Sequence, residues 1–148
     1  MAIYNAADLN TKNRHMGGYG NAVVVYGSVT PAAAVFGDVY RPVVIPAGLD
    51  VTDVDIINDK LDSSGAPTIN CKVGFSPLNA VEGPPAVDDY FASAGKAFFN
   101  TAGRTSLAFQ PIKFEKPVFL TLTLTGGAAA FASGKVTAIV KGDGIGVK

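Results

Sequence analysis

Apolar and polar residues alternate along much of the chain, and this two-residue period predicts β-strands. In residues 69–75 the odd positions, Cys71 among them, are apolar and the even positions are polar or glycine. Residues 118–125 and 136–141 alternate in the same way. Such a pattern is typical of strands that bury one face. We therefore expect Cys71 to lie in a core.

Three further segments are rich in β-branched residues and also predict strands. The first of them is residues 22–30, which contain neither a proline nor a charged residue. Residues 39–45 contain Pro42, which cannot donate a hydrogen bond to a neighbouring strand, so we expect an edge position or a bulge here. Residues 49–58 change phase near Thr52, which indicates that one extra residue is accommodated there as a β-bulge.

One further segment and one strand pairing complete the predicted layout. Residues 88–99 are expected to form a short helical turn, capped by Asp88 and ended near Gly95. The strands at 118–125 and 136–141 are expected to pair as a hairpin, joined by a long loop of small residues.

Together these elements predict one all-β domain, a β-sandwich or jelly roll of about seven to eight strands. The 148 residues suit a single domain. Residues 1–21 show neither a helical nor a strand period, so they are expected to form an extended N-terminal arm. The domain proper is expected at 22–142, followed by a C-terminal tail at 143–148.

Composition limits the partners. Twelve basic and twelve acidic side chains give a net charge of zero, which argues against a general electrostatic grip on nucleic acid or on an anionic membrane. The charges are nevertheless uneven, with six acids in residues 38–62 and six bases in residues 104–148. Two interpretations stay open: the two segments neutralise each other within one domain, or they attract each other between copies in an assembly.

The sequence also bears on location. It contains no run approaching the roughly 18 apolar residues of a membrane-spanning helix. The first residues lack a charged start followed by an apolar stretch, so they do not match a secretory signal. We expect a protein made in the cytoplasm.

Residues that usually carry catalysis are sparse. The only histidine, His15, lies in the arm, and the only cysteine, Cys71, lies in an alternating strand, so no catalytic triad, zinc site or cofactor is expected. Four acids fall within residues 53–62, namely Asp53, Asp55, Asp59 and Asp62. They lack the spacing of a calcium-binding loop, and Asp is common in turns without any metal. Whether this segment binds a cation stays open.

A pair of carboxylates for glycoside hydrolysis also stays open, because spacing along the chain does not fix separation in space. The chain has no tryptophan, although large aromatic side chains are what sugar-binding surfaces commonly use for stacking. Neither observation identifies an active site.

Residues 40–75 carry an ordered pattern: an arginine with an apolar strand, then PAG, then V-x-x-V-x-I, then D-x-L-D with G and T, then V-G. Its members are Arg41, Pro46, Ala47, Gly48, Val51, Val54, Ile56, Asp59, Leu61, Asp62, Gly65, Thr68, Val73 and Gly74. In this pattern the chain resembles a group of small structural proteins of tailed bacteriophages, found among head genes. Residues 91–103 and 117–142 are similar to the same group, so the resemblance covers residues 22–142.

The resemblance implies a capsid decoration, or cement, protein. Such a protein would be a β-sandwich or jelly-roll unit on the outside of the virion, bound to the major capsid protein and associated with itself as a dimer or trimer. It would need no catalysis. The arm is our candidate interface, because it has apolar anchors but no core of its own. The candidate residues are Tyr4, Leu9, Arg14, Met16 and Tyr19.

Three alternatives remain, and one of them is the hydrolase with two carboxylates, for which Asp59, Asp62, Asp88 and Asp89 are the candidates. Another virion part, such as a head–tail or tail component, would share the composition. The chain also suits a carbohydrate-binding β-sandwich module on the virion surface.

Overall fold

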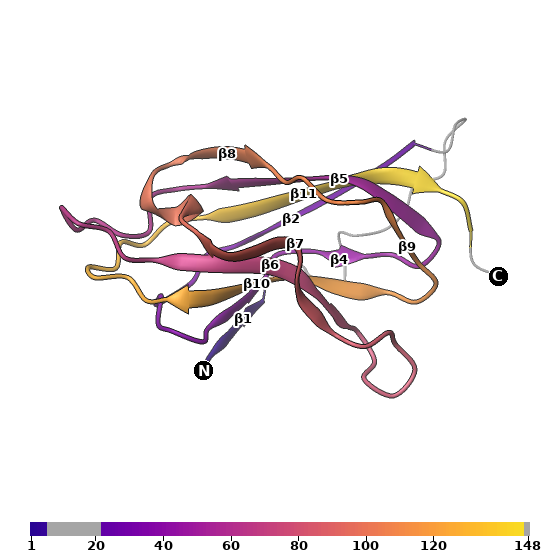
Figure 1. Ribbon diagram of the computed structural model, residues 1–148, viewed down its shortest axis with the longest axis horizontal. Coiled ribbons are helices and arrows are strands. Elements are labelled where there is room, and N and C mark those ends of the chain that lie inside the picture. The colour runs from indigo at the N-terminus through magenta and orange to yellow at the C-terminus, as the bar shows by residue number, and fades with distance from the viewer. Residues whose placement is uncertain (6–21, 147–148) are drawn as a thin grey trace.

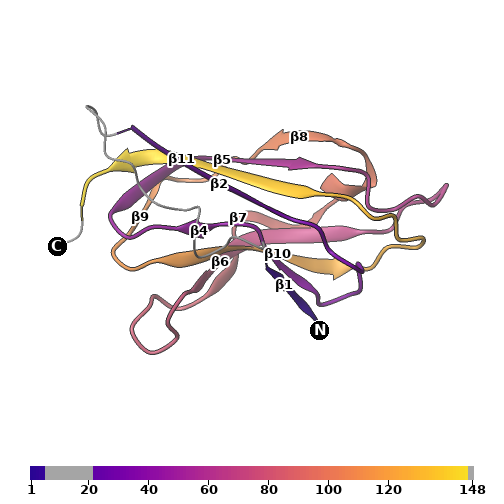
Figure 2. The same ribbon diagram turned by 180° about the vertical axis from the view of Figure 1, so that it is seen from behind.

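The computed structural model describes residues 1–5 and 22–146, which form two β-sheets packed face to face. Figures 1 and 2 show the sheets as an upper and a lower layer. The strands are β1 (Ile3–Asn5), β2 (Ala22–Val29), β3 (Val39–Arg41), β4 (Val44–Ile45), β5 (Leu49–Asn58), β6 (Asn70–Pro77), β7 (Val87–Lys96), β8 (Gly103–Ser106), β9 (Ile112–Phe114), β10 (Val118–Gly126) and β11 (Val136–Gly144), with a 3-10 turn at Phe98–Asn100. This architecture confirms the predicted all-β sandwich.

The first sheet has the strand order β1-β3-β10-β6-β7, and β4 pairs with β10 beyond the end of β3. The second sheet has the order β2-β11-β5-β8, and β9 pairs with the other end of β5. All pairings are antiparallel except that of β1 with β3. The central strands of both sheets are the alternating segments of the sequence.

The core lies between the two inner faces. Cys71, Val73 and Leu122 project from the first sheet and Val54 and Val140 from the second, and all are 0% exposed. Near β7 the core is aromatic: Phe75 packs edge-to-face on Phe114 at 4.9 Å between ring centroids, and Phe91 on Phe109 at 4.8 Å. Edge-to-face contacts add stabilisation beyond the burial of the rings.

The irregularities expected from proline and from the phase change are present. β3 ends at Arg41 and β4 begins at Val44, so the strand is interrupted at Pro42. In β5, Asp53 pairs with Lys141 whereas Val51 pairs with Gly142, which leaves Thr52 as the extra residue of a bulge. Both predictions are confirmed.

The helical turn predicted at 88–99 is wrong, because residues 87–96 form strand β7. This strand pairs with β6 through two register shifts, and these shifts remove the two-residue period that would have revealed a strand. Gly95, expected to end a helix, instead has φ of +88° within the strand. Tertiary pairing overrides local preference here.

The predicted hairpin of 118–125 with 136–141 is also wrong. Both segments are strands, but β10 lies in the first sheet and β11 in the second. The connection between them crosses from one layer to the other, and its length suffices for the roughly 10 Å between packed sheets. Alternation predicts which face of each strand is buried, but not which strand is its neighbour.

The predicted limits of the domain can be placed on the structure. β2 begins at Ala22, where the domain was expected to start. Residues 3–5 of the predicted arm form β1, which pairs with β3, and the last strand continues past residue 142 to Gly144.

Candidate binding surface

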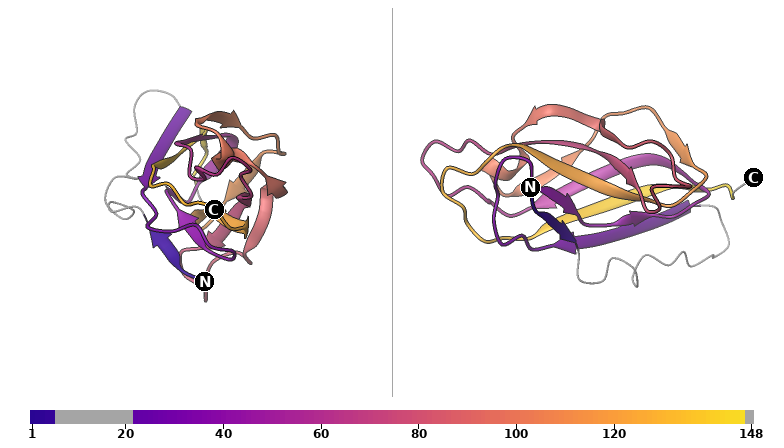
Figure 3. Two further views of the ribbon diagram at one scale, coloured as in Figure 1. Left: turned by 90° about the vertical axis from the view of Figure 1, so that its left-hand side faces the viewer. Right: turned by 90° about the horizontal axis from the view of Figure 1, so that it is seen from below.

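Three loops, residues 30–38, 62–68 and 127–134, meet at one end of the sandwich, and we call this end the tip. Ala128 N donates to Ala34 O at 2.9 Å, and Ser63 N donates to Ala130 O at 2.8 Å. Figure 1 shows the tip at the end opposite the C-terminus, and the left panel of Figure 3 views the molecule from that end. Segments distant in sequence thus form one continuous surface.

The exposed residues of the tip, all of which the structure describes, carry no charge. Its prominent side chains are Phe36 (71% exposed), Val35 (58%) and Phe131 (36%). The rest of the surface is mainly alanine, glycine, serine and threonine. Depletion of charge with exposed aromatic residues is the composition of protein interface cores.

Asp62 holds two of the tip loops in place. Its side chain is fully buried, and its carboxylate accepts hydrogen bonds from the backbone N of Ser64, Thr68, Ala129 and Ala130 at 2.9–3.1 Å. Burial alone would raise the pKa of Asp62, but the four N–H donors outweigh it and hold the pKa well below its ordinary value. The two loops are therefore held by contacts within the chain.

Asp38 fixes the third loop and ties the N-terminal strand to it. Its carboxylate accepts from Ala2 N at 2.8 Å and from Val35 N at 3.1 Å. Tyr40, on the following strand, donates its hydroxyl to Ala33 O at 2.8 Å. Burial, and next the Asp38 charge, raise the pKa of Tyr40, so it remains a hydrogen-bond donor at any physiological pH.

The acidic segment 53–62 makes ion pairs and hydrogen bonds within the chain. Asp55 is buried and is bound by Arg104, Ser106 and Lys141, and Lys141 Nζ also contacts Asp53 Oδ2 at 2.6 Å. The hydrogen bond from Arg104 is the main cause that lowers the pKa of Asp55. Among the described residues there is no group of three or more side chains arranged to hold a metal ion. The contacts support internal neutralisation of the two uneven charge segments.

The structure places the other candidate chemical groups as follows. Cys71 is a free thiol, 0% exposed, and burial raises its pKa to about 12, so at neutral pH it is a protonated core residue. This confirms its predicted burial. His15 lies outside the described residues. No helix in the described part of the chain is long and apolar enough to cross a membrane.

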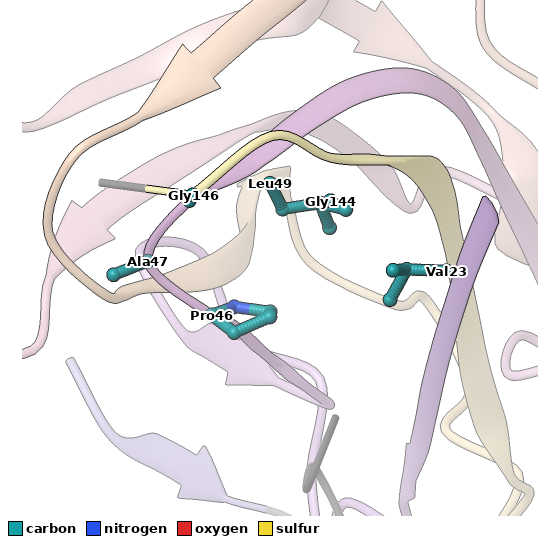
Figure 4. Close-up of a pocket in the computed structure, with 7 residues that line it drawn as sticks. Val23, Pro46, Ala47, Leu49, Gly144 and Gly146 are labelled. Atoms are coloured by element: carbon teal, nitrogen blue, oxygen red, sulfur yellow. The ribbon is translucent and has the colours of Figure 1, made fainter. Parts of the chain in front are cut away.

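A shallow pocket of about 170 Å³ lies where β2 begins and β11 ends (Figure 4). It is lined by apolar side chains and glycines, including Val23, Pro46 and Leu49 beside Gly144 and Gly146. None of its lining residues titrates or offers a nucleophile. The pocket therefore supplies no chemical group.

Of the five predicted interface residues, Tyr4 is the one within the described chain. It lies in β1, half-buried, with its ring edge-to-face on Tyr40 at 5.6 Å between centroids. Leu9, Arg14, Met16 and Tyr19 lie outside the described residues. Sequence reasoning missed the tip, although the segments TPAAAVFG and GAAAFASG each carry one aromatic residue in an otherwise small, neutral loop.

No family model and no curated protein matches the chain. Its fold is similar to that of chains in solved phage capsid structures. For a chain in the capsid of Ralstonia phage GP4 the TM-score is 0.74 at 15% identity, covering 97% of this chain and 99% of that one. For a chain in the cyanophage Pam1 capsid asymmetric unit the TM-score is 0.67 at 23% identity, covering 86% of this chain and 89% of that one. For a chain in the acidic stable capsid of Helicobacter pylori bacteriophage KHP30 the TM-score is 0.56 at 14% identity, covering 87% of this chain and 90% of that one. The fold is thus one that phage capsid chains have.

Proposed function

We propose that this protein is a bacteriophage virion structural protein, and more narrowly a decoration protein that binds the outside of the major capsid shell and stabilises it. The observation that carries the proposal is the likeness to a capsid chain over nearly the full length of both chains. The resemblance of residues 22–142 to phage head proteins supports the same class. The role is structural and needs no catalytic step. The protein is made in the host cytoplasm and resides on the capsid exterior.

The tip is the attachment surface in this proposal. Its neutral surface with Phe36 and Phe131 suits the centre of an interface, where charged residues are depleted. Its loops are already held by Asp38 and Asp62, so binding orders little additional chain. We propose the N-terminal arm as a second contact to the shell.

Stabilisation follows from mass action. A protein that binds the assembled shell, and not its dissociated subunits, shifts the equilibrium toward the shell. At a free concentration of 100 times Kd, each site contributes about 2.7 kcal/mol. Because one shell offers many equivalent sites, modest contacts are sufficient.

The proposal is tested with phage heads that lack the protein. Purified, fluorescently labelled protein is added back, the heads are imaged, and their resistance to heat is measured by DNA release. We expect label over the whole head and release at a higher temperature. Label confined to one vertex would instead indicate a head–tail component. No binding would refute the proposal.

Substitutions test the attachment surface. Phe36→Ser with Phe131→Ser removes the exposed aromatic rings of the tip, and we expect at least about a tenfold loss of affinity for heads. Val81→Ser is the matched control, because Val81 is 91% exposed but lies in the loop between β6 and β7. Equal affinities for the two variants would show that the tip is not the attachment surface.

The proposal includes association of the protein with itself. The edge of β2 supports this part. The strand is eight residues long, has no charged residue or proline, and pairs with β11 without a register shift. In the described part of the chain no strand pairs with its other side. Such an edge is a template for another strand, which monomeric proteins commonly block with charges, prolines or bulges.

A further inference from the structure

Arg41 lies on the outward face of the first sheet in an environment of neutral residues. Its guanidinium carbon is 4.6 Å from the centre of the Phe119 ring, in a cation–π contact. Because Leu122 pairs with Tyr40 and Thr123 with Val39, the next residue of β10, Thr121, lies beside Arg41. Asn5 of β1 is its partner on the other side. None of these neighbours carries a charge.

Arg41 has no carboxylate partner among the described residues, in contrast to the other arginine there, Arg104, which binds Asp55. The Nε of Arg41 is buried, and no acceptor in the described part of the chain binds it. The hydroxyl oxygens of Thr121 and of Ser76, which faces Phe119 across the sheet, are likewise buried and have no hydrogen-bond partner within residues 1–5 and 22–146. Three polar groups without partners thus gather on one face.

This arrangement opposes folding stability. Burying part of a charge without a counter-charge costs free energy, and an apolar side chain of similar size would avoid that cost. The lowered pKa of Arg41, caused by its burial, reports the same penalty. Residues that reduce the stability of the free protein are typical of binding sites.

We propose that Arg41 receives the carboxylate of an acidic side chain from the capsid shell subunit, which makes this face a docking site in addition to the tip and the arm. The inference rests on the proposed function and names the chemistry of the partner. A guanidinium binds a carboxylate through two parallel hydrogen bonds, and the cation–π contact with Phe119 holds the guanidinium group over the ring. Because Arg41 carries one positive charge and its neighbours are neutral, its electrostatic complement is a single carboxylate. Lys72, which lies two strands away on β6, is already paired with Asp88 at 2.5 Å.

The test combines the stability of the free protein with the occupancy of heads. Arg41→Met keeps an unbranched apolar stem over Phe119 but removes the charge. We expect its Tm in solution to equal or exceed that of wild type, and its affinity for heads to fall at least about tenfold. Affinity of wild type is expected to weaken with added NaCl more steeply than that of Arg41→Met. Arg41→Lys, which keeps the charge without the planar fork, is expected to be intermediate.

Arg104→Met is the matched control. It also removes one arginine, but Arg104 is paired within the chain, so we expect a lower Tm with unchanged affinity for heads. If Arg41→Met binds heads as wild type does, the inference is wrong while the proposed function stands. If the wild-type protein itself does not bind heads, both the inference and the proposed function are wrong. If Arg41→Met lowers Tm, or turns a dimer into a monomer, the residue is structural or binds a second copy, and the inference is overturned.

Discussion

Two buried carboxylates are accommodated in different ways. Asp55 is neutralised by the side chains of Arg104 and Lys141, whereas Asp62 is stabilised by backbone N–H groups. Sequence reasoning predicted Asp62 only as a turn residue, because two of its donors lie 67 and 68 positions away along the chain. The burial of Cys71 was predictable, since it depends only on local alternation.

Asp62→Asn is expected to loosen the tip and destabilise the domain. The amide group of asparagine donates hydrogen bonds, so two of the four backbone N–H groups would lose their acceptor. We expect Tm at pH 7 to fall on the order of 10 °C. Asp59→Asn is the control, because among the described residues the Asp59 carboxylate accepts from the backbone N of Lys135 alone, at 2.7 Å. Equal Tm values for the two variants would contradict the role of Asp62.

The contribution of Asp62 also depends on pH. Its pKa in the folded protein lies below the value of about 3.9 for an unfolded chain. The stability that it contributes is therefore fully present above about pH 4 and is lost as the pH falls further. Between pH 5 and pH 2.5 the Tm of wild type should fall more steeply than that of Asp62→Asn. Parallel curves would refute this account.

At the scale of elements, regular alternation identified β6, β10 and β11, and the phase change identified the bulge of β5. The errors concern irregular pairing and sheet order. β7 has two register shifts, so its sequence lacks a strand period. The partners of β10 and β11 depend on layer packing, which leaves no mark on the pattern of either strand.

The bulge at Thr52 makes a specific prediction about deletions. Without Thr52, residues Leu49 and Val51 alternate regularly with Val54, so all three still face the core. We expect this deletion to lower the free energy of unfolding, measured with urea, by less than about 2 kcal/mol. Deletion of Thr137, in the regular strand β11, turns buried positions such as Val136 outward and should cost at least about 3 kcal/mol. If deletion of Thr52 destabilised the protein more than deletion of Thr137, the assignment of the bulge would be wrong.

Pairing of β2 with β2 of a second copy is the next prediction at this scale. The outward residues Val24 and Tyr26 are 60% and 59% exposed, and across a two-fold axis each strand would face its own sequence. Val24→Lys with Tyr26→Lys would place like charges together and should abolish dimers in sedimentation velocity. Ile57→Lys is the control, because it lies in β5, which has partners on both sides.

Hydrogen exchange shows whether a second copy or the chain itself covers the free edge of β2. In a dimer through β2, protection of the β2 amides should rise with protein concentration, and the two-lysine variant should lose this rise. Protection that is equal at all concentrations in a monomer would mean that the chain covers its own edge. That result would remove β2 from the proposed self-association.

At the scale of the whole molecule, charge and neutral surface are separated. Acids of residues 53–55 bind bases from the last third of the chain on the outer side of one sheet, and the tip is left without exposed charge. The sequence revealed the uneven charges and the sandwich. It did not reveal that three neutral loops would meet, because that depends on how the two sheets are joined.

The two parts of the N-terminal segment should respond differently to substitution. Tyr4 packs on Tyr40 within the sheet, so Tyr4→Ala is expected to lower Tm by about 2–4 °C, the effect of roughly 1 kcal/mol. Leu9→Ser, Met16→Ser and Tyr19→Ser together, in the predicted arm, should leave Tm unchanged and reduce the occupancy of heads. Calorimetry and binding to heads measure the two effects. If the triple variant binds as wild type does, the arm is not a contact and attachment rests on the tip and Arg41.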